Sequence, residues 1–237
     1  AGDVIVDAQS TSEISALIAS ASLAVGAGKD SGIGVSIGVS VARNLIGYDA
    51  FGNQEAAGVR AYLSNASVQA GGDLIITAVS EQTINALVVS GSIAVGGSSQ
   101  TGVGAGGSGV YAENRIGTDV EASITGAGNH GIEVDLVKLT ARDRSSIYAV
   151  AGAASIVVGA GGQTGVAVSI GVALGWNEIA NRVNAFILDA TEGVTTRGGD
   201  ISVAAIEMAT IWAVAAAASL SVGGGGTTGV SVSGAGA

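Results

Sequence analysis

The chain has 237 residues, among them 40 Gly, no Pro and no Cys, and 48% of its residues are hydrophobic although only 3% are aromatic. The absence of Cys excludes a disulfide scaffold and a thiolate metal site. Nine Lys and Arg residues against 19 Asp and Glu residues give a formal net charge of −10, which repels phosphate backbones and anionic lipid headgroups. Nucleic acid is therefore not expected as a partner.

The two ends of the chain bear on its targeting, and one long uncharged run bears on membrane insertion. The sequence begins at Ala1 without a Met and stops in a run of Gly and Ala, which is typical of a segment of a longer protein, and no signal peptide is visible. The uncharged run 147–176 is long enough to cross a bilayer, but the Gly-rich stretch 159–163 interrupts it and basic flanks are missing. We expect no membrane insertion.

Similar residues recur along the chain at intervals of 70, 63 and 64 positions. The aligned columns are Ile14, Ile84, Ile147 and Ile211; Leu23, Ile93, Ile156 and Leu220; Val25, Val95, Val158 and Val222; and Gly32, Gly102, Gly165 and Gly229. Such columns predict a repeat architecture of about 3.5 repeats of roughly 64 residues. The approximate repeats are 1–70, 71–133, 134–197 and 198–237, within a single domain 1–237.

In the first repeat, period-two alternation of apolar residues predicts strands near 4–8, 14–25, 33–42 and 59–68. The extra residues Gly47–Asn53 predict an exposed turn. In the last repeat, the run Ala213–Ala218 would suit a helix, but its aligned counterparts are rich in Ser and β-branched residues, which favours strands.

The simplest packing places each strand on its counterpart one repeat later, in parallel, so that the Val and Ile columns become internal ladders. Asn44, Asn114 and Asn177 then predict a ladder of stacked, hydrogen-bonded amides. Two alternatives stay open. One repeat could form a single wide coil or about three narrow coils of roughly 21 residues, and the two long strands could instead pair as an antiparallel hairpin across the turn 28–31.

The small residues that alternate with the aliphatic ones predict a flat, nearly featureless face on the long strands. Ser36 and Ser169 lie on this face. We expect it to pack on a second layer of the same coil or on a neighbouring solenoid, which would thicken a fibre.

The strand motifs 72–78 (Gly-Asp-Leu-Ile-Ile-Thr-Ala) and 199–204 (Gly-Asp-Ile-Ser-Val-Ala) resemble the Gly-Asp-Ile-x-Val-x-Ala motif of filamentous haemagglutinin-type and leukotoxin-like giant bacterial adhesins. The third repeat departs from it, with Val134, Asp135 and Leu136 in place of Gly-Gly-Asp. The resemblance implies a right-handed β-helical shaft within a very large secreted or surface-anchored protein, and it brings no catalytic residues.

Few residues point to chemistry. His130 is the only His and lies in a turn-like stretch, so neither a catalytic triad nor a multi-His metal site is expected. Glu133 and Asp135 would share a strand face, as paired acids must, but a solvated acidic face explains them more simply. Asp3, Asp73 and Asp200 recur beside Gly, a pattern that suggests calcium binding. The calcium-binding nonapeptide is missing, however, and turn capping accounts for these residues.

The Gly runs 159–162 and 223–226 lack the Lys and Ser or Thr of a phosphate-binding loop and predict turns. We therefore expect no catalytic, cofactor or metal site. The function expected is a structural shaft or filament-forming segment of an extracellular or cell-surface adhesin, whose partners are neighbouring repeats, laterally associated copies and an unspecified receptor. The alternatives are a β-helical polysaccharide lyase or hydrolase, or a membrane β-barrel segment.

Overall fold

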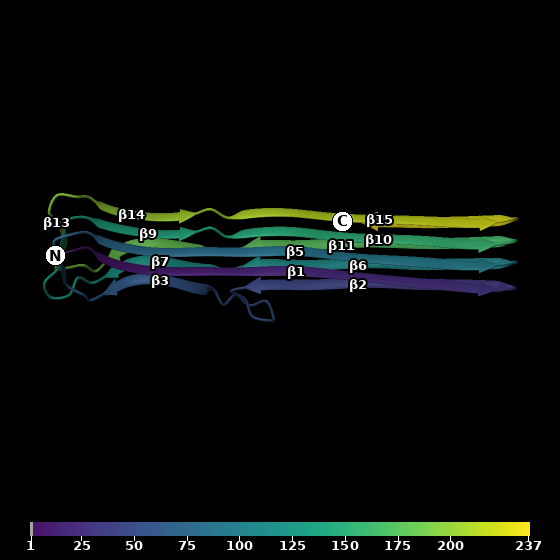
Figure 1. Cartoon of the computed structure of the whole chain (residues 1–237), viewed down its shortest axis with the longest axis horizontal. Helices are drawn as coiled ribbons and strands as arrows, with labels where there is room; N and C mark the ends of the chain where they lie inside the picture. Colours follow the sequence, from purple (N-terminus) through teal and green to yellow (C-terminus); the bar gives the residue numbers. More distant parts are fainter. Residues whose placement is uncertain (1) are drawn as a thin grey trace.

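The structure, a computed structural model, describes residues 2–237, and every regular element in that range is a β-strand. The 16 strands form four sheets, and the strands within each sheet pair in parallel. The long strands lie almost side by side along the length of the molecule (Figure 1). The expected all-β class with parallel, solenoid-like stacking is confirmed.

Two large sheets and two small sheets make up the fold. Sheet A contains β1 (Val4–Gly28), β5 (Leu74–Ser98), β9 (Val137–Asp143), β10 (Ser146–Gly161), β14 (Ile201–Glu207) and β15 (Thr210–Gly225). Sheet B contains β2 (Ser31–Ile46), β6 (Thr101–Ile116), β11 (Thr164–Ile179) and β16 (Thr228–Gly236). Sheet C contains β3 (Ala57–Ser64), β7 (Thr118–Thr125) and β12 (Arg182–Leu188). Sheet D contains β4 (Val68–Gln69), β8 (Ile132–Val134) and β13 (Val194–Thr196).

Strand register follows the sequence columns residue by residue. Ile14 pairs with Ile84, Ile84 with Ile147, and Ile147 with Ile211. Because a strand meets its counterpart only after a whole repeat, each repeat forms one wide coil, and the alternative of three narrow coils is wrong. The antiparallel hairpin is also wrong, since β1 and β2 belong to different sheets.

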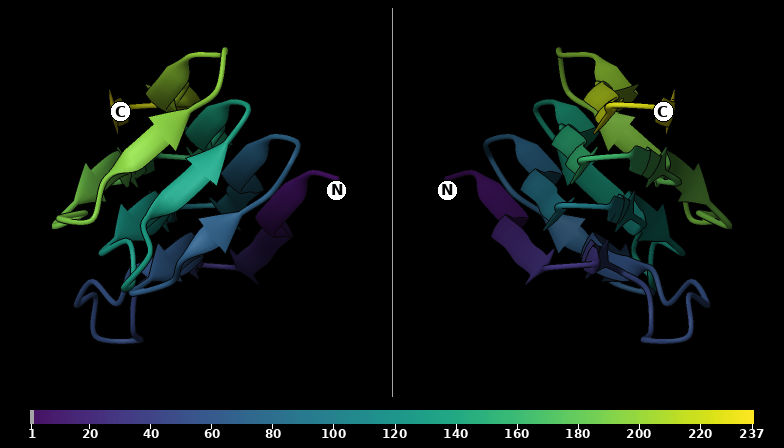
Figure 2. Two further views of the ribbon diagram at one scale, coloured as in Figure 1. Left: turned by 90° about the vertical axis from the view of Figure 1, so that its left-hand side faces the viewer. Right: turned by 90° about the vertical axis from the view of Figure 1, so that its right-hand side faces the viewer.

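Each coil runs out along sheet A, reverses at a tight turn and returns along sheet B. It then continues through sheets C and D to the start of the next coil. Viewed along the strands, the coils lie above one another in chain order, from the N-terminal end to the C-terminal end (Figure 2). Sheets A and B therefore face each other as two layers of the same coil.

Two regions of each coil differ in how they are filled. The first, here called the broad end, is enclosed by sheets C and D and the beginning of sheet A. Large aliphatic side chains fill it, and Leu74, Ile124 and Leu139 are all fully buried. This region has the hydrophobic interior expected of a stacked β fold.

The second region, here called the thin blade, is the long part where only sheets A and B face each other. Most interior side chains become smaller towards the turn, from Ile84 and Ile147 through Ala151 and Ala153 to Ser92 and Ser155. Val157 is the exception, since it lies opposite Gly104 and Gly106. At the tip only Gly fits: a Cβ on Gly96 would lie 1.9 Å from the carbonyl oxygen of Val103 in the facing layer. The two layers therefore converge to backbone contact.

This convergence contradicts part of the expected interior. The columns of Leu23 and Val25, and the alternating aliphatic residues that begin at Ile33, were expected inside, but they face outward. Leu23 is 70% exposed, whereas Gly34 is buried. Because side chains alternate strictly between the two faces of a strand, putting Gly, Ser and Ala inside forces the larger residues outside.

The small-residue face packs on the second layer of its own coil, as one of the two expected arrangements proposed. Ser36 Oγ lies 2.7 Å from Ser22 Oγ in the facing sheet. Ser169 Oγ donates to the carbonyl oxygen of Ser155 at 3.0 Å. These two hydroxyl groups, buried between the layers, thus have hydrogen-bond partners, as burial usually requires, whereas the buried Ser108 Oγ on β6 has none.

The strands near 4–8 and 14–25 were expected to be separate, but they are continuous in the first two coils as β1 and β5. They separate in the third coil, between β9 and β10, where Asp143 is fully buried. Its carboxylate accepts hydrogen bonds from Thr118 Oγ1 at 3.1 Å, from Ser145 N at 3.0 Å and from Asn181 Nδ2 at 2.7 Å. These bonds draw the backbone away from a straight strand.

Candidate interaction surface

The outer face of sheet B carries large aliphatic side chains that nothing else in residues 2–237 covers. Ile37 is 69% exposed and Ile170 is 53% exposed. Soluble monomers seldom expose contiguous apolar patches beyond a few hundred Å², so this surface is a candidate for an interaction, as is the outer face of sheet A, where Leu17 and Leu23 are exposed. This outer aliphatic face consists of Ile33, Val35, Ile37, Val39, Val41, Val103, Val166, Val168, Ile170, Val172, Leu174, Val230 and Val232.

A depression runs along β6 in the middle of this face. The register places Gly107 between Ile37 and Ile170, and it places Gly109 between Val39 and Val172 in the next outward row. Glycine has no side chain, so β6 is lower there than its two neighbours. The resulting hollow has a volume of about 440 Å³ and an almost wholly apolar lining.

Packing within the chain does not require this hollow. No atom lies within 4 Å of the position that a Cβ on Gly109 would occupy. Larger side chains would fit at this position in the isolated molecule, unlike at the glycines that face the interior.

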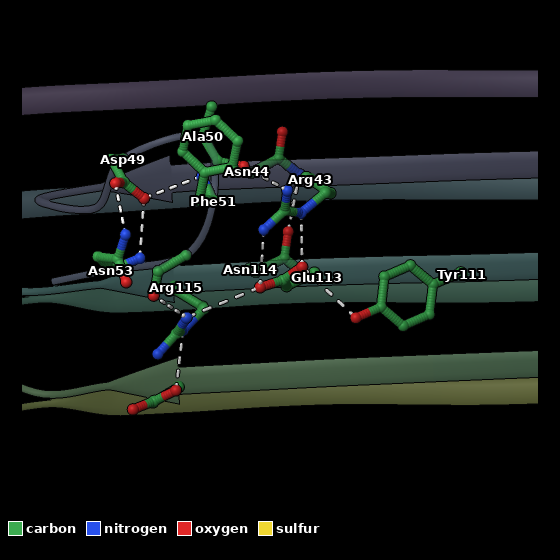
Figure 3. A network of polar contacts seen from close by, with 12 residues as sticks. Arg43, Asn44, Asp49, Ala50, Phe51, Asn53, Tyr111, Glu113, Asn114 and Arg115 are labelled. Atoms are coloured by element: carbon green, nitrogen blue, oxygen red, sulfur yellow. Dashed lines mark hydrogen bonds and ion pairs between the residues drawn. The ribbon is translucent and has the colours of Figure 1, made fainter.

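Polar ladders cross sheet B where the thin blade meets the broad end (Figure 3). The amide Nδ2 of Asn44 donates to Oδ1 of Asn114 at 2.7 Å, and Nδ2 of Asn114 donates to Oδ1 of Asn177 at 2.8 Å. The expected ladder of stacked Asn side chains is confirmed. The ladder provides hydrogen-bond partners for the side-chain amide of Asn114, which is completely buried.

Ion pairs follow the same strands on the outer side. Arg43 Nε lies 2.7 Å from Glu113 Oε2, and Arg115 Nε lies 2.9 Å from Glu178 Oε2. The hydrogen bond from the Arg43 guanidinium holds the pKa of Glu113 below its ordinary value of 4.5. Burial raises the pKa of Tyr48, whose ring lies 4.0 Å from the Arg115 guanidinium carbon. These contacts join neighbouring coils through side chains as well as backbone.

The extra residues of the first repeat form an exposed loop, as expected, and Phe51 is 91% exposed. Arg43 Nη1 donates to the Ala50 carbonyl oxygen at 2.7 Å, and Arg115 Nη1 donates to the Gly52 carbonyl oxygen at 3.0 Å. Gln54 Nε2 reaches the carbonyl oxygen of Ala180, two coils further along, at 2.8 Å. The loop is thus fastened along the stack.

His130 lies exposed on a turn, as expected. Its backbone amide donates to Ser67 Oγ at 3.0 Å. It borders a polar hollow of about 480 Å³ that Asp189 and Glu192 also line. Asn65, Gly126 and Asp189 adopt positive φ at equivalent positions of successive coils in this corner, and Gly, Asn and Asp are the residues that tolerate this conformation best.

Glu133 and Asp135 lie on the same side of the molecule, where both contact Arg197. Arg197 Nη1 is 3.5 Å from Glu133 Oε1, and Arg197 Nε is 3.1 Å from Asp135 Oδ1. The two acids are about half exposed. They form a solvated acidic face, as expected, and Arg197 of the next coil pairs with both acids.

The remaining sequence candidates lie in turns. Asp3 Oδ1 accepts a hydrogen bond from the backbone amide of Asp73, which stacks above it, at 3.0 Å. In residues 2–237 no cluster of three or more His, Cys, Asp or Glu residues is placed to hold a metal ion. The Gly runs 159–162 and 223–226 were expected to be turns, but Gly159–Gly161 and Gly223–Gly225 end strands β10 and β15, and only Gly162 and Gly226 lie in the tip turns. The same part of the chain contains no helix long and apolar enough to cross a membrane.

Sequence reasoning missed the outward direction of the aliphatic residues and the burial of Asp143. A signal existed for the first, because small residues (Gly, Ser and Ala) fill alternate positions of both long strands near the tip, where Gly lies near Gly of the facing strand. Asp143 lies at an alternating position whose counterpart is Ser80. No pattern distinguished it from the exposed acids.

Comparison of the chain with protein-family models, with curated proteins and with solved structures found no match.

Proposed function

We propose that this chain is a structural shaft or filament-forming segment of a large bacterial adhesin, that it acts outside the cell or on its surface, and that it has no catalytic role. In this proposal the stack is a right-handed β-helix of about 3.5 repeats of roughly 64 residues. Its partners are neighbouring repeats and further copies of itself.

The observation that carries this proposal is the unbroken register between coils. β1 and β5 pair over 25 consecutive residues, and β5 continues in register with β10. Parallel pairing of this length supports a rod that resists bending, because each backbone group along the strand is bonded to the coils on either side.

Side-chain ladders add support along the axis. The Asn44–Asn114–Asn177 ladder and the Arg43–Glu113 ion pair both join residues that are neighbours across coils and distant in sequence. A shaft that transmits force from one end to the other needs such contacts between successive coils, whereas a catalytic groove needs convergent side chains around a substrate.

The mechanical part of the proposal can be tested by single-molecule force spectroscopy with handles at the two ends of the chain. We expect stepwise release of one coil at a time, with contour-length increments of about 220 Å for a coil of roughly 64 residues. Release of the whole chain in a single low-force step would contradict a load-carrying stack.

The non-catalytic part can be tested with a panel of acidic and neutral polysaccharides, by measuring new reducing ends and unsaturated uronates. We expect no turnover. Turnover that disappears in the double variant Glu133→Gln and Asp135→Asn would overturn the proposal and establish the polysaccharide-cleaving alternative.

A further inference from the structure

We propose that the outer aliphatic face of sheet B binds the same face of a second copy of this chain, with the ridges of one copy seated in the grooves of the other. The inference rests on the proposed function only for its filament-forming role. It moves the expected lateral contact from the small-residue face, which the structure buries, to the opposite face of the same strands.

The height of the face alternates from strand to strand. In the row of Ile37, the register continues through Gly107 and Ile170 to Gly234. The next outward row repeats the order as Val39, Gly109, Val172 and Gly236. In these two rows β2 and β11 are therefore ridges, whereas β6 and β16 are grooves, with a spacing of about 9.6 Å between successive ridges. The relief is confined to these rows, because β6 carries Val103 and Tyr111 and β16 carries Val230 and Val232 in the other rows.

This pattern is self-complementary under one rotation. A twofold axis parallel to the strands, midway between β6 and β11, places the β11 ridge of each copy over the β6 groove of the other. The same rotation places each β2 ridge over a β16 groove. A twofold axis perpendicular to the strands would instead set ridge against ridge. Closed twofold symmetry with one self-complementary patch is the commonest arrangement of homodimers.

Charge favours a second copy as the occupant. The segments 31–42, 101–112, 164–177 and 228–237 of sheet B contain no Asp, Glu, Lys or Arg, although the chain has a formal net charge of −10. Two strongly acidic molecules can approach each other where neither carries charge. A lipid surface is the less suitable occupant, since interfacial membrane binding usually relies on Lys and Arg beside the apolar face.

The area of the face matches what a dimer needs. Eleven residues along each of β2, β6 and β11 and the nine residues of β16 cover roughly 650 Å² of flat area before corrugation is counted. Stable protein interfaces bury about 800 Å² on each partner. The hollow along β6, with its volume of about 440 Å³, can receive the side chains of Ile170 and Val172 from the second copy.

Sedimentation equilibrium of the full chain tests the inference. We expect a reversible dimer with a Kd in the micromolar range or below, and two variants should weaken it at least tenfold. Ile170→Lys introduces a charge on a ridge. Gly107→Val fills the groove, and its nearest neighbour is the Ile170 carbonyl oxygen, 3.9 Å from the new Cβ, so folding should not suffer. The matched control is Ile93→Lys. Ile93 lies on the outer side of sheet A and is 44% exposed, so this variant should leave the dimer intact.

A cysteine pair tests the symmetry. Within one molecule β2 and β16 are separated by two strands, about 14 Å, too far for a disulfide. The double variant Ile37→Cys and Gly234→Cys should form covalent dimers on oxidation, whereas each single variant should stay unlinked.

A monomeric wild-type chain at 100 µM or above would overturn the inference, as would a dimer that only Ile93→Lys disrupts. So would a monomer that co-sediments with neutral phosphatidylcholine vesicles, since the face would then bind lipid. Any of these results would leave the stepwise release of coils under force unaffected, so the shaft and the lateral contact are tested separately.

Discussion

The broad end and the thin blade of each coil share sheet A but are packed in opposite ways. At the broad end, Leu and Ile fill the space between three sheets, and stability comes from burial of apolar surface. In the thin blade, Gly, Ala and Ser let two sheets approach closely, and the aliphatic side chains lie outside. The difference shows that alternation along a strand defines two faces, while the distance to the opposite layer decides which face is interior.

The largest effect is expected at the broad end. Leu139→Ala removes a fully buried side chain from its core, and we expect the free energy of unfolding to fall by about 2–5 kcal/mol. The control is Ile37→Ala on the outer face of the blade, where 69% of the residue is already exposed. Urea denaturation followed by circular dichroism, at a concentration where the chain is monomeric, measures both. Equal losses in the two variants would contradict the contrast between the regions.

The next effect is expected at the tip of the blade. A Cβ at Gly102 would lie 2.0 Å from the carbonyl oxygen of Ala160, so Gly102→Ala must push the two layers apart. We expect a loss of about 1–3 kcal/mol, as for other overpacked interiors. Gly109→Ala is the control on the same strand, since its Cβ meets nothing within 4 Å. If the two variants are equally stable by urea denaturation, the layers are not in backbone contact.

A comparable effect is expected at the boundary between the two regions. Asn114→Ala breaks both hydrogen bonds of the buried ladder and leaves the amides of Asn44 and Asn177 without their shared partner. We expect a loss of about 1–3 kcal/mol, the cost of buried polar groups without partners. Asn129→Ala, at an exposed position, should have almost no effect. Thermal denaturation of the two variants distinguishes a hydrogen-bonded ladder from a set of independent side chains.

The smallest effect concerns the ion pair beside that ladder. Arg43 lowers the pKa of Glu113, so the pair stabilises the folded chain above the ordinary glutamate value of 4.5 and is lost as the pH falls below it. Because the Arg43 side chain is 39% exposed, solvent screens the pair, and its loss at pH 7 should destabilise the chain less than any of the three changes above. Denaturation of wild type and Glu113→Gln at pH 7 and pH 3 should show a larger difference at pH 7 than at pH 3. A difference that grows at pH 3 would contradict the assigned pair.

Much of the fold could be predicted from sequence columns, because residues one repeat apart do lie above one another and the Asn ladder follows from their register. Which face of the long strands is interior could not be predicted from one strand alone. In most proteins the larger apolar residues are interior, and nothing in a single alternating segment such as Ile33–Val41 reveals a facing layer too close for them. That distance arises only when the tip turn brings Gly26 against Ile33. The candidate surface was missed for the same reason.

The most direct test of the account is the accessibility of alternating positions on one strand. The chain has no native Cys, so single Cys variants can be compared by their rate of reaction with a maleimide at low protein concentration. We predict fast modification at Ile170→Cys and Val35→Cys, on the outer face, and strong protection at their neighbours Ser169→Cys and Ser36→Cys. Protection of the aliphatic positions and fast reaction of the serine positions would contradict the account.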